Sequence, residues 1–409
     1  MGKNTKKQFD LLVIGAGAAG MMAAITAARD NKKVCILERL DKAGKKLLAT
    51  GNGKCNFTNA DMSAECYGGN QAFVSHILEQ FMVDECLQFF NSIGIYPKNK
   101  NGYYYPNSEQ ASSVVSALIE EIERLGIVIS YETLVLDIIS TTEIVTVKTS
   151  KGEFCAPKLI IATGLLAAPK LGSDGSLFDI IKNFGHRFTP ILPALCGFYC
   201  KGMQFKKVSG VRANGTVTAI IDGQVVSKDT GEIQFTDYGL SGIPVFQISR
   251  YLSKGLYQKS NVKVAINLLP NWEKEQVLGE LNHRKTMKYT QPVSSLLNGL
   301  INQKLSDALM EKANIDKELF VSSLSDTQMN RLADVLQEIS VTVTKFRDYE
   351  FAQVCTGGIP VSDIDWSTLE SKYVSNVHFA GEILDVDGIC GGYNLHFAWA
   401  TGFLAAKSL

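Results

Sequence analysis

The sequence carries no net charge, because its 41 Lys and Arg residues equal its 41 Asp and Glu residues. A chain without an overall field has no global attraction for nucleic acid or for an anionic membrane surface. The one local exception is a group of cations at Lys201, Lys206, Lys207 and Arg212. Nucleic acid is therefore disfavoured as a partner, and this cluster alone keeps that alternative open.

The sequence also lacks a clear export signal or membrane span. Lysines 3, 6 and 7 precede a charge-free run from Leu11 to Ala28, which hydropathy alone would allow as a signal peptide or short span. This run, however, contains three glycines at dinucleotide spacing and leads into a strand rather than a cleavage site. No other stretch approaches spanning length. We therefore expect a cytoplasmic protein that does not bind a membrane.

No cysteine pattern indicates a disulfide framework or a metal site. The nine cysteines are an odd number in a chain of 409 residues, so reduced thiols are expected. Cys196 and Cys200 form the only close pair. They have no His or Cys partners at ligand spacing, so no metal is predicted.

The most informative feature present is the run from Asp10 to Gly20. It places Gly15, Gly17 and Gly20 in G-x-G-x-x-G spacing directly after an apolar strand at 9–14. A helical pattern follows, and a second strand at 33–37 ends on Glu38. In this motif the glycines permit a tight turn, close approach of a pyrophosphate and close helix–strand packing, while the acid accepts hydrogen bonds from a ribose. The context predicts a dinucleotide site.

The rest of the chain predicts an α/β fold with an insertion. Helical patterns near 71–92 and 108–125 precede β-rich runs at 127–139, 144–149 and 153–155, and a buried strand leads to Gly164. Residues 195–270 alternate, with turns expected at 214–215, 222–223 and 230–231, which predicts an antiparallel sheet or small barrel in an inserted domain at 195–271. Short amphipathic helices and a return strand are expected over 272–344. The nucleotide-binding domain is therefore discontinuous, at 1–194 and 345–409.

A second motif lies near the C-terminus. Residues 377–394 read as strand, acid, glycine turn and helix in order. A late segment of this type would place Glu382 near a ribityl chain and point a helix N-terminus at a flavin, where it stabilises negative charge on the reduced ring. One flavin dinucleotide would need both ends of the chain, whereas a nicotinamide dinucleotide would not. We therefore predict FAD rather than FMN, since the first motif requires an adenosine ribose.

Three segments resemble the signature of one flavoprotein family. They are Gly44-Lys-Lys-Leu-Leu-Ala-Thr-Gly-Asn-Gly-Lys-Cys-Asn-Phe-Thr-Asn59, Cys355-Thr-Gly-Gly-Ile359 and Asp387-Gly-Ile-Cys-Gly-Gly-Tyr-Asn-Leu395. The family includes aminoacetone oxidase and the 3-dehydro-bile acid delta(4,6)-reductase of gut bacteria, and the similarity runs over nearly the whole chain. It implies a split Rossmann-like FAD-binding domain with an inserted antiparallel β-rich domain and a small helical subdomain.

Carried over from this resemblance, the residues implied to contact FAD are Gly15, Gly17, Ala18, Ala19, Gly20, Glu38, Lys45, Lys46, Asn56, Val135, Thr163, Gly164, Glu382, Asn394 and Leu395. One departure is visible: the family's usual Ala-Thr-Gly-Gly reads Ala-Thr-Gly164-Leu165 here. The Lys45-Lys46 pair could be a solvated charge run, but its Gly-rich loop favours contact with phosphate or ribityl oxygens.

Absences narrow the chemistry. A second G-x-G-x-x-G does not occur, so a nicotinamide donor, NAD(P)H, would have to dock transiently at the flavin. No C-x4-C dithiol follows the first motif, which disfavours thiol–disulfide reduction.

No catalytic residue is identified, but two residues are candidates. His396 could reach the flavin edge or donate a proton, or it could be a packed, hydrogen-bonded histidine. Arg347 could hold a substrate carboxylate or lie solvated on the surface. Cys390 fits a small filler in a turn better than a nucleophile, and Tyr103–Tyr105 could close a pocket or alternate in a hairpin.

These features support three hypotheses. The first is an FAD-dependent reductase of an activated C=C bond of an enone, with an apolar, carbonyl-bearing small molecule such as a 3-oxo-4,6-diene bile acid or steroid as substrate. That specific substrate is implied by the resemblance. The second is an oxidase of a small amine or amino ketone at the same site. The third is a flavin-bound RNA-modifying or redox-sensing protein, which would require a basic surface.

Overall fold

The computed structural model describes residues 7–409 and divides into two compact units. Unit 1 comprises the chain up to Leu192 together with Gln353–Leu409, and unit 2 is Pro193–Ala352. The sequence predicted the second boundary at 344/345, which falls inside strand β19 (Ile339–Phe346). Because Phe346 pairs with Phe198 of unit 2, the whole strand belongs to that unit.

Unit 1 is built on a five-stranded parallel sheet. Its order is β21 (Val377–Phe379), β12 (Lys158–Ile161), β2 (Leu11–Ile14), β3 (Val34–Leu37) and β8 (Val128–Ser130). All residues of β2 and β3 are buried. Burial on both faces is typical of parallel sheets covered on both sides, and it explains the apolar runs in the sequence. The parallel sheet of the expected Rossmann-like α/β domain is therefore present.

Unit 1 also contains smaller sheets besides the five-stranded parallel sheet. One contains β1 (Lys7–Gln8), β11 (Gly152–Ala156), β10 (Val145–Thr149) and β9 (Val135–Ser140). Others contain β4 (Thr58–Asn59), β7 (Tyr103–Pro106) and β6 (Pro97–Lys100), and the pair β22 (Val386–Gly388) and β5 (Tyr67–Gly69). Further short strands are β13 (Leu192–Ala194) and β20 (Val354–Thr356).

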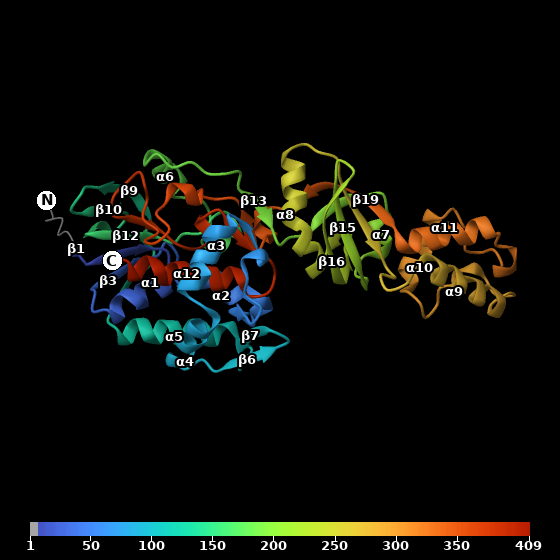
Figure 1. The fold of residues 1–409 in the computed structure, drawn as a ribbon, viewed down its shortest axis with the longest axis horizontal. Helices are drawn as coiled ribbons and strands as arrows, with labels where there is room; N and C mark the ends of the chain where they lie inside the picture. The colour runs from blue at the N-terminus through green and yellow to red at the C-terminus, as the bar shows by residue number, and fades with distance from the viewer. Residues whose placement is uncertain (1–6) are drawn as a thin grey trace. The chain divides into compact units, whose positions relative to one another are not determined.

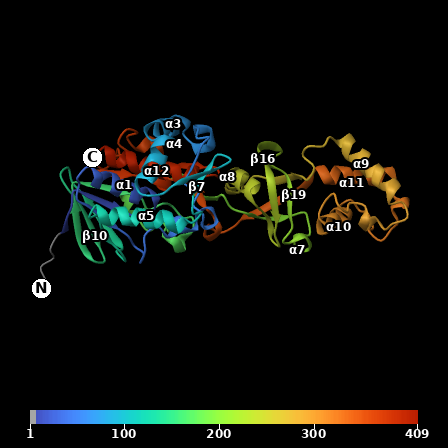
Figure 2. The ribbon, with the colours of Figure 1, turned by 90° about the horizontal axis from the view of Figure 1, so that it is seen from below.

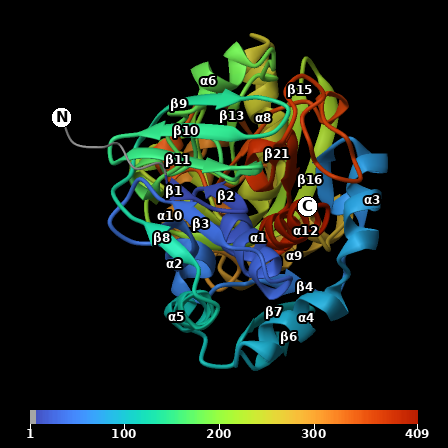
Figure 3. The same ribbon diagram turned by 90° about the vertical axis from the view of Figure 1, so that its left-hand side faces the viewer.

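The helices of unit 1 are α1 (Ala18–Arg29), α2 (Lys45–Ala49), α3 (Gln71–Gln80), α4 (Val83–Ser92), α5 (Ala111–Arg124), α6 (Phe178–Asn183) and α12 (Tyr393–Lys407). Helices α1 and α12, from opposite ends of the chain, lie side by side (Figure 3). A Cβ on Gly402 would lie only 2.3 Å from the carbonyl oxygen of Ala19. The two backbones therefore touch, and only glycine fits at this crossing.

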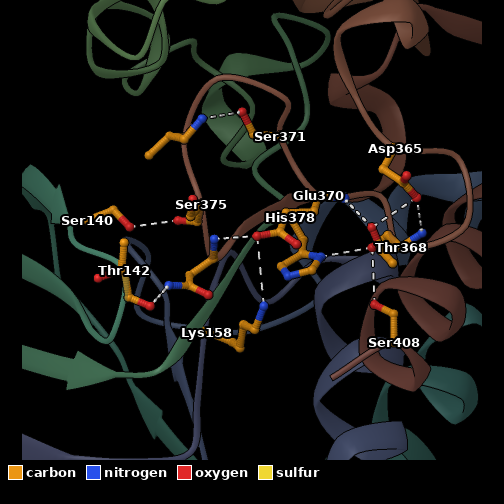
Figure 4. A network of polar contacts seen from close by, with 12 residues as sticks. Ser140, Thr142, Lys158, Asp365, Thr368, Glu370, Ser371, Ser375, His378 and Ser408 are labelled. Carbon is orange, nitrogen blue, oxygen red and sulfur yellow. Dashed lines mark hydrogen bonds and ion pairs between the residues drawn. The ribbon is translucent and has the colours of Figure 1, made fainter.

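A polar network fixes the edge strand β21 (Figure 4). His378 Nδ1 lies 2.8 Å from the Thr368 carbonyl oxygen, and Lys158 Nζ lies 3.8 Å from Glu370. Ser140 donates to the Ser375 carbonyl at 2.7 Å. These contacts hold the loop before β21 to strands β9 and β12, so the C-terminal segment is anchored before it enters α12.

Unit 2 contains a closed antiparallel barrel (Figures 1 and 2). Its strands are β14 (Phe198–Lys201), β17 (Gly239–Ser241), β16 (Gln224–Phe235), β15 (Arg212–Ile221), β18 (Val262–Asn267) and β19. Its helices are α7 (Phe205–Val208), α8 (Ile243–Tyr257), α9 (Lys274–Met287), α10 (Gln303–Lys312) and α11 (Asp326–Gln337).

Two features of the barrel differ from the sequence prediction. Helix α8 lies within the range predicted to be wholly β-rich, and it buries Val245, Ile248 and Leu252 at helical spacing. Of the three predicted turns only that at 222–223 separates strands; Gly215 and Gly231 instead pair with each other in the ladder. A Cβ on Gly215 would lie 2.6 Å from the Asn267 carbonyl oxygen, so this glycine serves close strand approach rather than a turn.

Within residues 7–409, no helix combines the length and the apolar character needed to cross a bilayer.

Candidate functional site

The glycine turn between β2 and α1 is shaped by backbone contacts. Gly15, with φ of +102°, donates to the Leu37 carbonyl at 2.9 Å, and a Cβ there would lie 2.7 Å from the Ala162 oxygen. A Cβ on Gly20 would lie 1.9 Å from the Gly15 oxygen. Gly17 is different, since a Cβ built on it meets no atom of residues 7–409 within 4 Å. The fold requires Gly15 and Gly20, but it does not require Gly17.

The N-terminus of α1 offers free backbone donors. Gly17 is the N-cap, it supplies no capping side chain, and the first turn contains no acid. The first intrahelical bond runs from Met21 N to the Gly17 oxygen, so the N–H groups of residues 18–20 have no partner within the helix. These donors and the helix dipole favour an anion at this point.

Glu38 is fixed beside this turn at the end of β3. Its Oε2 accepts from Ala16 N and its Oε1 from Leu40 N, both at 2.7 Å. Thr133 N donates to the Glu38 carbonyl at 2.9 Å, which brings the start of β9 and the buried Val135 to the same edge. The acid and Val135 therefore gather where the motif predicts an adenosine, and their contact with a ribose stays a prediction.

The two lysines of the Gly-rich loop have different partners. Lys45 pairs with Asp41 at 2.5 Å, whereas Lys46 pairs with Glu382 at 2.5 Å. The other oxygen of Glu382 accepts from Cys355 N at 2.9 Å. A Cβ on Gly164 would lie 3.7 Å from Glu382 Oε2. Four segments far apart in sequence thus meet at one carboxylate, and only Lys46 of the lysine pair takes part.

The departure after Thr163 is accommodated. Gly164 adopts φ of +68°, which favours glycine, whereas Leu165 does not adopt positive φ and is fully buried. A second glycine is not required by the backbone here, so leucine fills the core instead.

The N-terminus of α12 packs against the loop that carries Asn56. Gly392 is its N-cap with φ of +93°, and a Cβ there would lie 2.7 Å from the Thr58 oxygen and 2.9 Å from Asn56 Oδ1. Asn56 Oδ1 is buried and has no hydrogen-bond partner among the described residues. The Asn394 side chain accepts from Gly388 N at 2.8 Å and donates to the Gly388 oxygen at 2.9 Å. It therefore braces the turn, and the N–H groups of 393–395 stay available.

His396 lies one turn further into α12 and is fully buried. Its Nδ1 lies 2.8 Å from Thr58 Oγ1 and its Nε2 lies 3.0 Å from the Phe81 carbonyl oxygen. A carbonyl can only accept, so Nε2 donates and Nδ1 accepts from the Thr58 hydroxyl. Burial lowers the pKa of His396 to about 4. This geometry matches the packed, hydrogen-bonded histidine and not a proton donor at the flavin edge.

The turn before α12 is flanked by two tyrosines. A Cβ on Gly391 would lie 2.9 Å from both Tyr103 Cε1 and Tyr393 Cε2. Tyr103 belongs to the predicted hairpin, β6–β7, and is 39% exposed, whereas Tyr393 is buried. Cys390 is only partly buried. Tyr103 is thus the more exposed of the two tyrosines beside this turn.

Arg347, the other residue that the sequence offers as a catalytic candidate besides His396, belongs to unit 2. Its guanidinium lies over the rings of Tyr238 and Phe351.

Sequence reasoning missed the residues that dock the Asn56 loop on α12. Trp399 Nε1 donates to the Phe57 oxygen at 3.0 Å, and Asn59 Nδ2 donates to the Gly391 oxygen at 2.9 Å. Thr58 also docks this loop on α12, because its hydroxyl hydrogen bonds to His396. The sequence did indicate such contacts, because the terminal helix contains a tryptophan and a histidine. Both carry polar atoms that need hydrogen-bond partners when buried.

Comparisons with known proteins identify the family of this chain. Residues 9–408 match the family model of the HI0933-like protein Rossmann domain. The chain is 40% identical over 400 residues to a 3-dehydro-bile acid delta(4,6)-reductase of Clostridium scindens, covering 97% of this chain and 98% of the relative. It is 30% identical over 406 residues to a ribosomal RNA dihydrouridine synthase of Haemophilus influenzae, covering 97% and 98%.

Among solved structures, a 3-ketosteroid-delta4-(5alpha)-dehydrogenase from Rhodococcus jostii RHA1 shares 15% identity with a TM-score of 0.48, covering 98% of this chain and 96% of that one.

The Rossmann domain of this family implies a flavin, and the residues fit one. The space into which a Cβ on Gly17 would point is empty, and it lies beside the free N–H donors at the start of α1. Asn56 presents a buried oxygen without a partner next to the free donors of α12. Residues 18–20, Lys46, Asn56 and the N–H groups of 393–395 would hold the group, which would supply redox chemistry there.

Proposed function

Because the chain belongs to the HI0933-like family, we propose that it is an FAD-dependent reductase of a C=C bond conjugated to a carbonyl. The observation that carries this proposal is shared chemistry among its relatives. The reductase of Clostridium scindens is named for the delta(4,6) bonds of a 3-dehydro bile acid, and the synthases are named for dihydrouridine. Saturating a 3-oxo-4,6-diene and saturating the C5–C6 bond of uracil both add hydride to a carbon conjugated with a carbonyl.

The cofactor is FAD rather than FMN. Glu38 and the start of β9 gather beside the first glycine turn, where only a dinucleotide would have a ribose and an adenine to contact. When bound, reduced FAD supplies the hydride. A reduced nicotinamide is the proposed electron donor, and it docks transiently because no second dinucleotide motif is present.

The chain's own residues position the cofactor and supply a proton. Free N–H groups at the start of α12 favour the negative charge that a reduced flavin carries. His396 stays neutral and holds Thr58, and with it the loop of Asn56. The proton that completes saturation comes from Tyr103, whose ring lies beside Gly391 and whose side chain is 39% exposed. Burial raises the pKa of the neighbouring Tyr393, which therefore stays protonated.

Tyr103→Phe is expected to lower turnover of an enone roughly 100-fold, the usual contribution of general acid catalysis, while the flavin spectrum stays unchanged. Steady-state kinetics under anaerobic conditions measure the effect. Tyr96→Phe is the matched control, since Tyr96 is 73% exposed and should keep full turnover. Equal activity of wild type and the Tyr103 variant would remove Tyr103 from the proposed mechanism.

The proposed substrate is a 3-oxo-4,6-diene bile acid or steroid, because the relative at 40% identity is named for that reaction. The decisive experiment reduces the purified protein without oxygen and then adds one oxidant at a time. We expect rapid flavin reoxidation and a saturated product with a 3-oxo-4-ene or 4,6-diene steroid, and slow reoxidation by oxygen. Fast peroxide formation without enone turnover would reject the reductase and favour the amine oxidase.

A second candidate, saturation of uridine in RNA, is favoured by the 30% and 28% identical synthases. The predicted cation cluster gives it weak support. Lys207 pairs with Glu311 and Arg212 pairs with Glu232, both at 2.9 Å, so two of its four charges are compensated. Adding ribosomal RNA to the reduced protein in the same assay tests this candidate; reoxidation by RNA with no enone turnover would promote it.

A further inference from the structure

The hairpin β6–β7 of unit 1 (Figure 1) contributes to a group of three lysines around one acid. Glu109 follows this hairpin, and its Oε1 lies 2.8 Å from Lys98 Nζ and 2.5 Å from Lys100 Nζ. Its Oε2 lies 3.4 Å from Nζ of Lys54, which comes from the Gly-rich loop. Within residues 7–409, Glu109 is the one carboxylate that pairs with Lys54, Lys98 and Lys100, which we call the lysine cluster.

The lysine cluster keeps a surplus of positive charge. Hydrogen bonds from Lys100 and Lys98 lower the pKa of Glu109 to about 2, so this acid is ionised at neutral pH. It compensates one of the three ammonium charges. The side chains of Lys54, Lys98 and Lys100 are 52%, 40% and 41% exposed. The other two charges are therefore accessible to an anion from solvent.

The position of Glu109 is fixed by a turn. Its N–H donates to the Pro106 carbonyl at 2.8 Å, and its φ is +53°, a value that is uncommon for residues other than glycine. A carboxylate held in this turn gathers the three ammonium groups before any ligand binds.

Tyrosines on the same face of the hairpin connect the lysine cluster with the turn before α12. The antiparallel register places Lys98 opposite Tyr105 and Lys100 opposite Tyr103. Residues directly opposite each other lie on one face of a sheet. Lys100 Nζ also lies 6.0 Å from the centroid of the Tyr105 ring. At the other end, Tyr103 Cε1 lies 2.9 Å from the position of a Cβ on Gly391. One sheet face of unit 1 therefore runs from the lysine cluster to the proposed flavin site.

A phosphomonoester matches the charge of this cluster. Such a group carries about −1.5 to −2 charges near pH 7 and has three acceptor oxygens. Lysines bind phosphate as point charges, and neighbouring aromatic rings can stack on a nucleotide base. Both reduced nicotinamide dinucleotides contain a pyrophosphate, but only NADPH carries a phosphomonoester, on the 2′-oxygen of its adenosine ribose. The lysine cluster therefore offers a means of distinguishing NADPH from NADH.

We propose that the lysine cluster binds the 2′-phosphate of NADPH, so that NADPH rather than NADH reduces the flavin of this protein. This inference rests on the proposed function and names its electron donor. The step transfers a hydride from NADPH to oxidised FAD, with one proton from solvent, and leaves NADP⁺ and reduced FAD. Lys54, Lys98 and Lys100 act in binding and take no part in the hydride transfer.

The first test mixes the oxidised holoenzyme with NADPH or NADH without oxygen and follows the loss of flavin absorbance. Wild type is compared with the double variant Lys98→Met/Lys100→Met. Lys148→Met is the matched control, because Lys148 also lies on a strand of unit 1, is 43% exposed and pairs with a single acid, Asp137, at 3.0 Å. Circular dichroism and the flavin spectrum confirm that each variant is folded and loaded.

We expect wild type to be reduced by NADPH at least about tenfold faster than by NADH at equal, low concentrations of each. The double variant should lose about 10- to 100-fold of the rate with NADPH, the range for charge-assisted hydrogen bonds, and less than about threefold with NADH. Lys148→Met should keep the wild-type ratio. Equal rates with both dinucleotides in wild type, or equal losses with both in the double variant, would overturn the inference.

Calorimetric binding to the oxidised holoenzyme tests the phosphate itself. The probes are 2′,5′-ADP, which carries the 2′-phosphate, 5′-AMP, which lacks it, and inorganic phosphate. We expect 2′,5′-ADP to bind at least about tenfold more tightly than the other two, and the double variant to lose this preference. Inorganic phosphate that binds as tightly as 2′,5′-ADP would indicate a surface that attracts any anion and would contradict a nucleotide site.

These outcomes are distinguishable from failure of the proposed function. If NADPH reduces the flavin in a manner that depends on the lysine cluster, but no enone reoxidises it, the enone reductase fails and the assignment of the donor stands. If neither dinucleotide reduces the flavin, the assignment of the donor fails, whereas enone turnover with chemically reduced protein would still support the reductase.

Discussion

Replacement of Gly17 with valine is expected to give a folded protein that no longer retains FAD. Gly17 has φ of −86°, which any residue adopts, and a Cβ on it meets nothing within 4 Å in the described part of the chain. The fold itself therefore tolerates a side chain at this N-cap. In the dinucleotide motif the second glycine is needed because the backbone approaches the pyrophosphate, so a valine would occupy that space.

The expected loss is at least about fivefold in FAD affinity, since steric overlap of this kind costs roughly 1–3 kcal/mol or more. The ratio of flavin to protein absorbance measures it, and chromatography of the released chromophore identifies FAD in the wild type. A yellow Gly17→Val protein with normal occupancy would contradict the assigned pyrophosphate site. Release of FMN alone from wild type would contradict the whole dinucleotide assignment.

Gly20→Val is the informative counterpart three residues away. Its Cβ would lie 1.9 Å from the Gly15 oxygen, so α1 could not pack on β2. This variant should lose cofactor and fold together, with a lower unfolding midpoint by circular dichroism. The contrast between a folded, colourless Gly17 variant and an unfolded Gly20 variant separates loss of binding from loss of structure.

The first βαβ unit could be predicted closely because its signals are local. The predicted strands at 9–14 and 33–37 compare with β2 at Leu11–Ile14 and β3 at Val34–Leu37. Buried parallel strands read as apolar runs, and glycine spacing fixes the turn between them. The barrel strands could be predicted less well from the sequence. Gly215 and Gly231 resemble turn residues, but they are required for close backbone approach within paired strands.

The site was predictable only where one segment builds it. The donors of α1 follow from the glycine motif, but the pairing of Lys46 with Glu382 joins residues 336 positions apart. No local pattern indicates which of Lys45 and Lys46 finds that partner. His396 shows the same limit: its neighbours Thr58 and Phe81 come from distant segments, so the sequence left its packed and catalytic alternatives open.

Acid is expected to destabilise unit 1 through His396. Burial lowers the pKa of this imidazole from 6.5 to about 4 in the folded protein. Between pH 4 and 6.5 the unfolded chain binds a proton at this imidazole that the folded chain excludes. The contribution of the neutral imidazole to folding stability is therefore complete above pH 6.5 and is lost as pH falls toward 4. The loss at pH 4 is about 3 kcal/mol. Burial also lowers the pKa of His186 and of His378, which act in the same direction.

The loop of Asn56 should respond in the same pH range. Protonation of Nδ1 would remove its ability to accept from Thr58, and that bond holds the loop against the start of α12. Release of FAD and loss of stability should therefore fall together between pH 6.5 and 4. Urea unfolding followed by tryptophan fluorescence at several pH values measures stability, and free flavin fluorescence reports release.

His396→Gln tests the assignment, because glutamine can hydrogen bond but does not titrate. It should be less stable than wild type near pH 8 by about 1–2 kcal/mol, since its bonds are less well placed, and should lose about 3 kcal/mol less between pH 6.5 and 4. His283→Gln is the control, because His283 is exposed and its replacement should leave the acid slope as in wild type. An unchanged slope in His396→Gln would show that another group causes the acid sensitivity and that His396 does not anchor the loop by staying neutral.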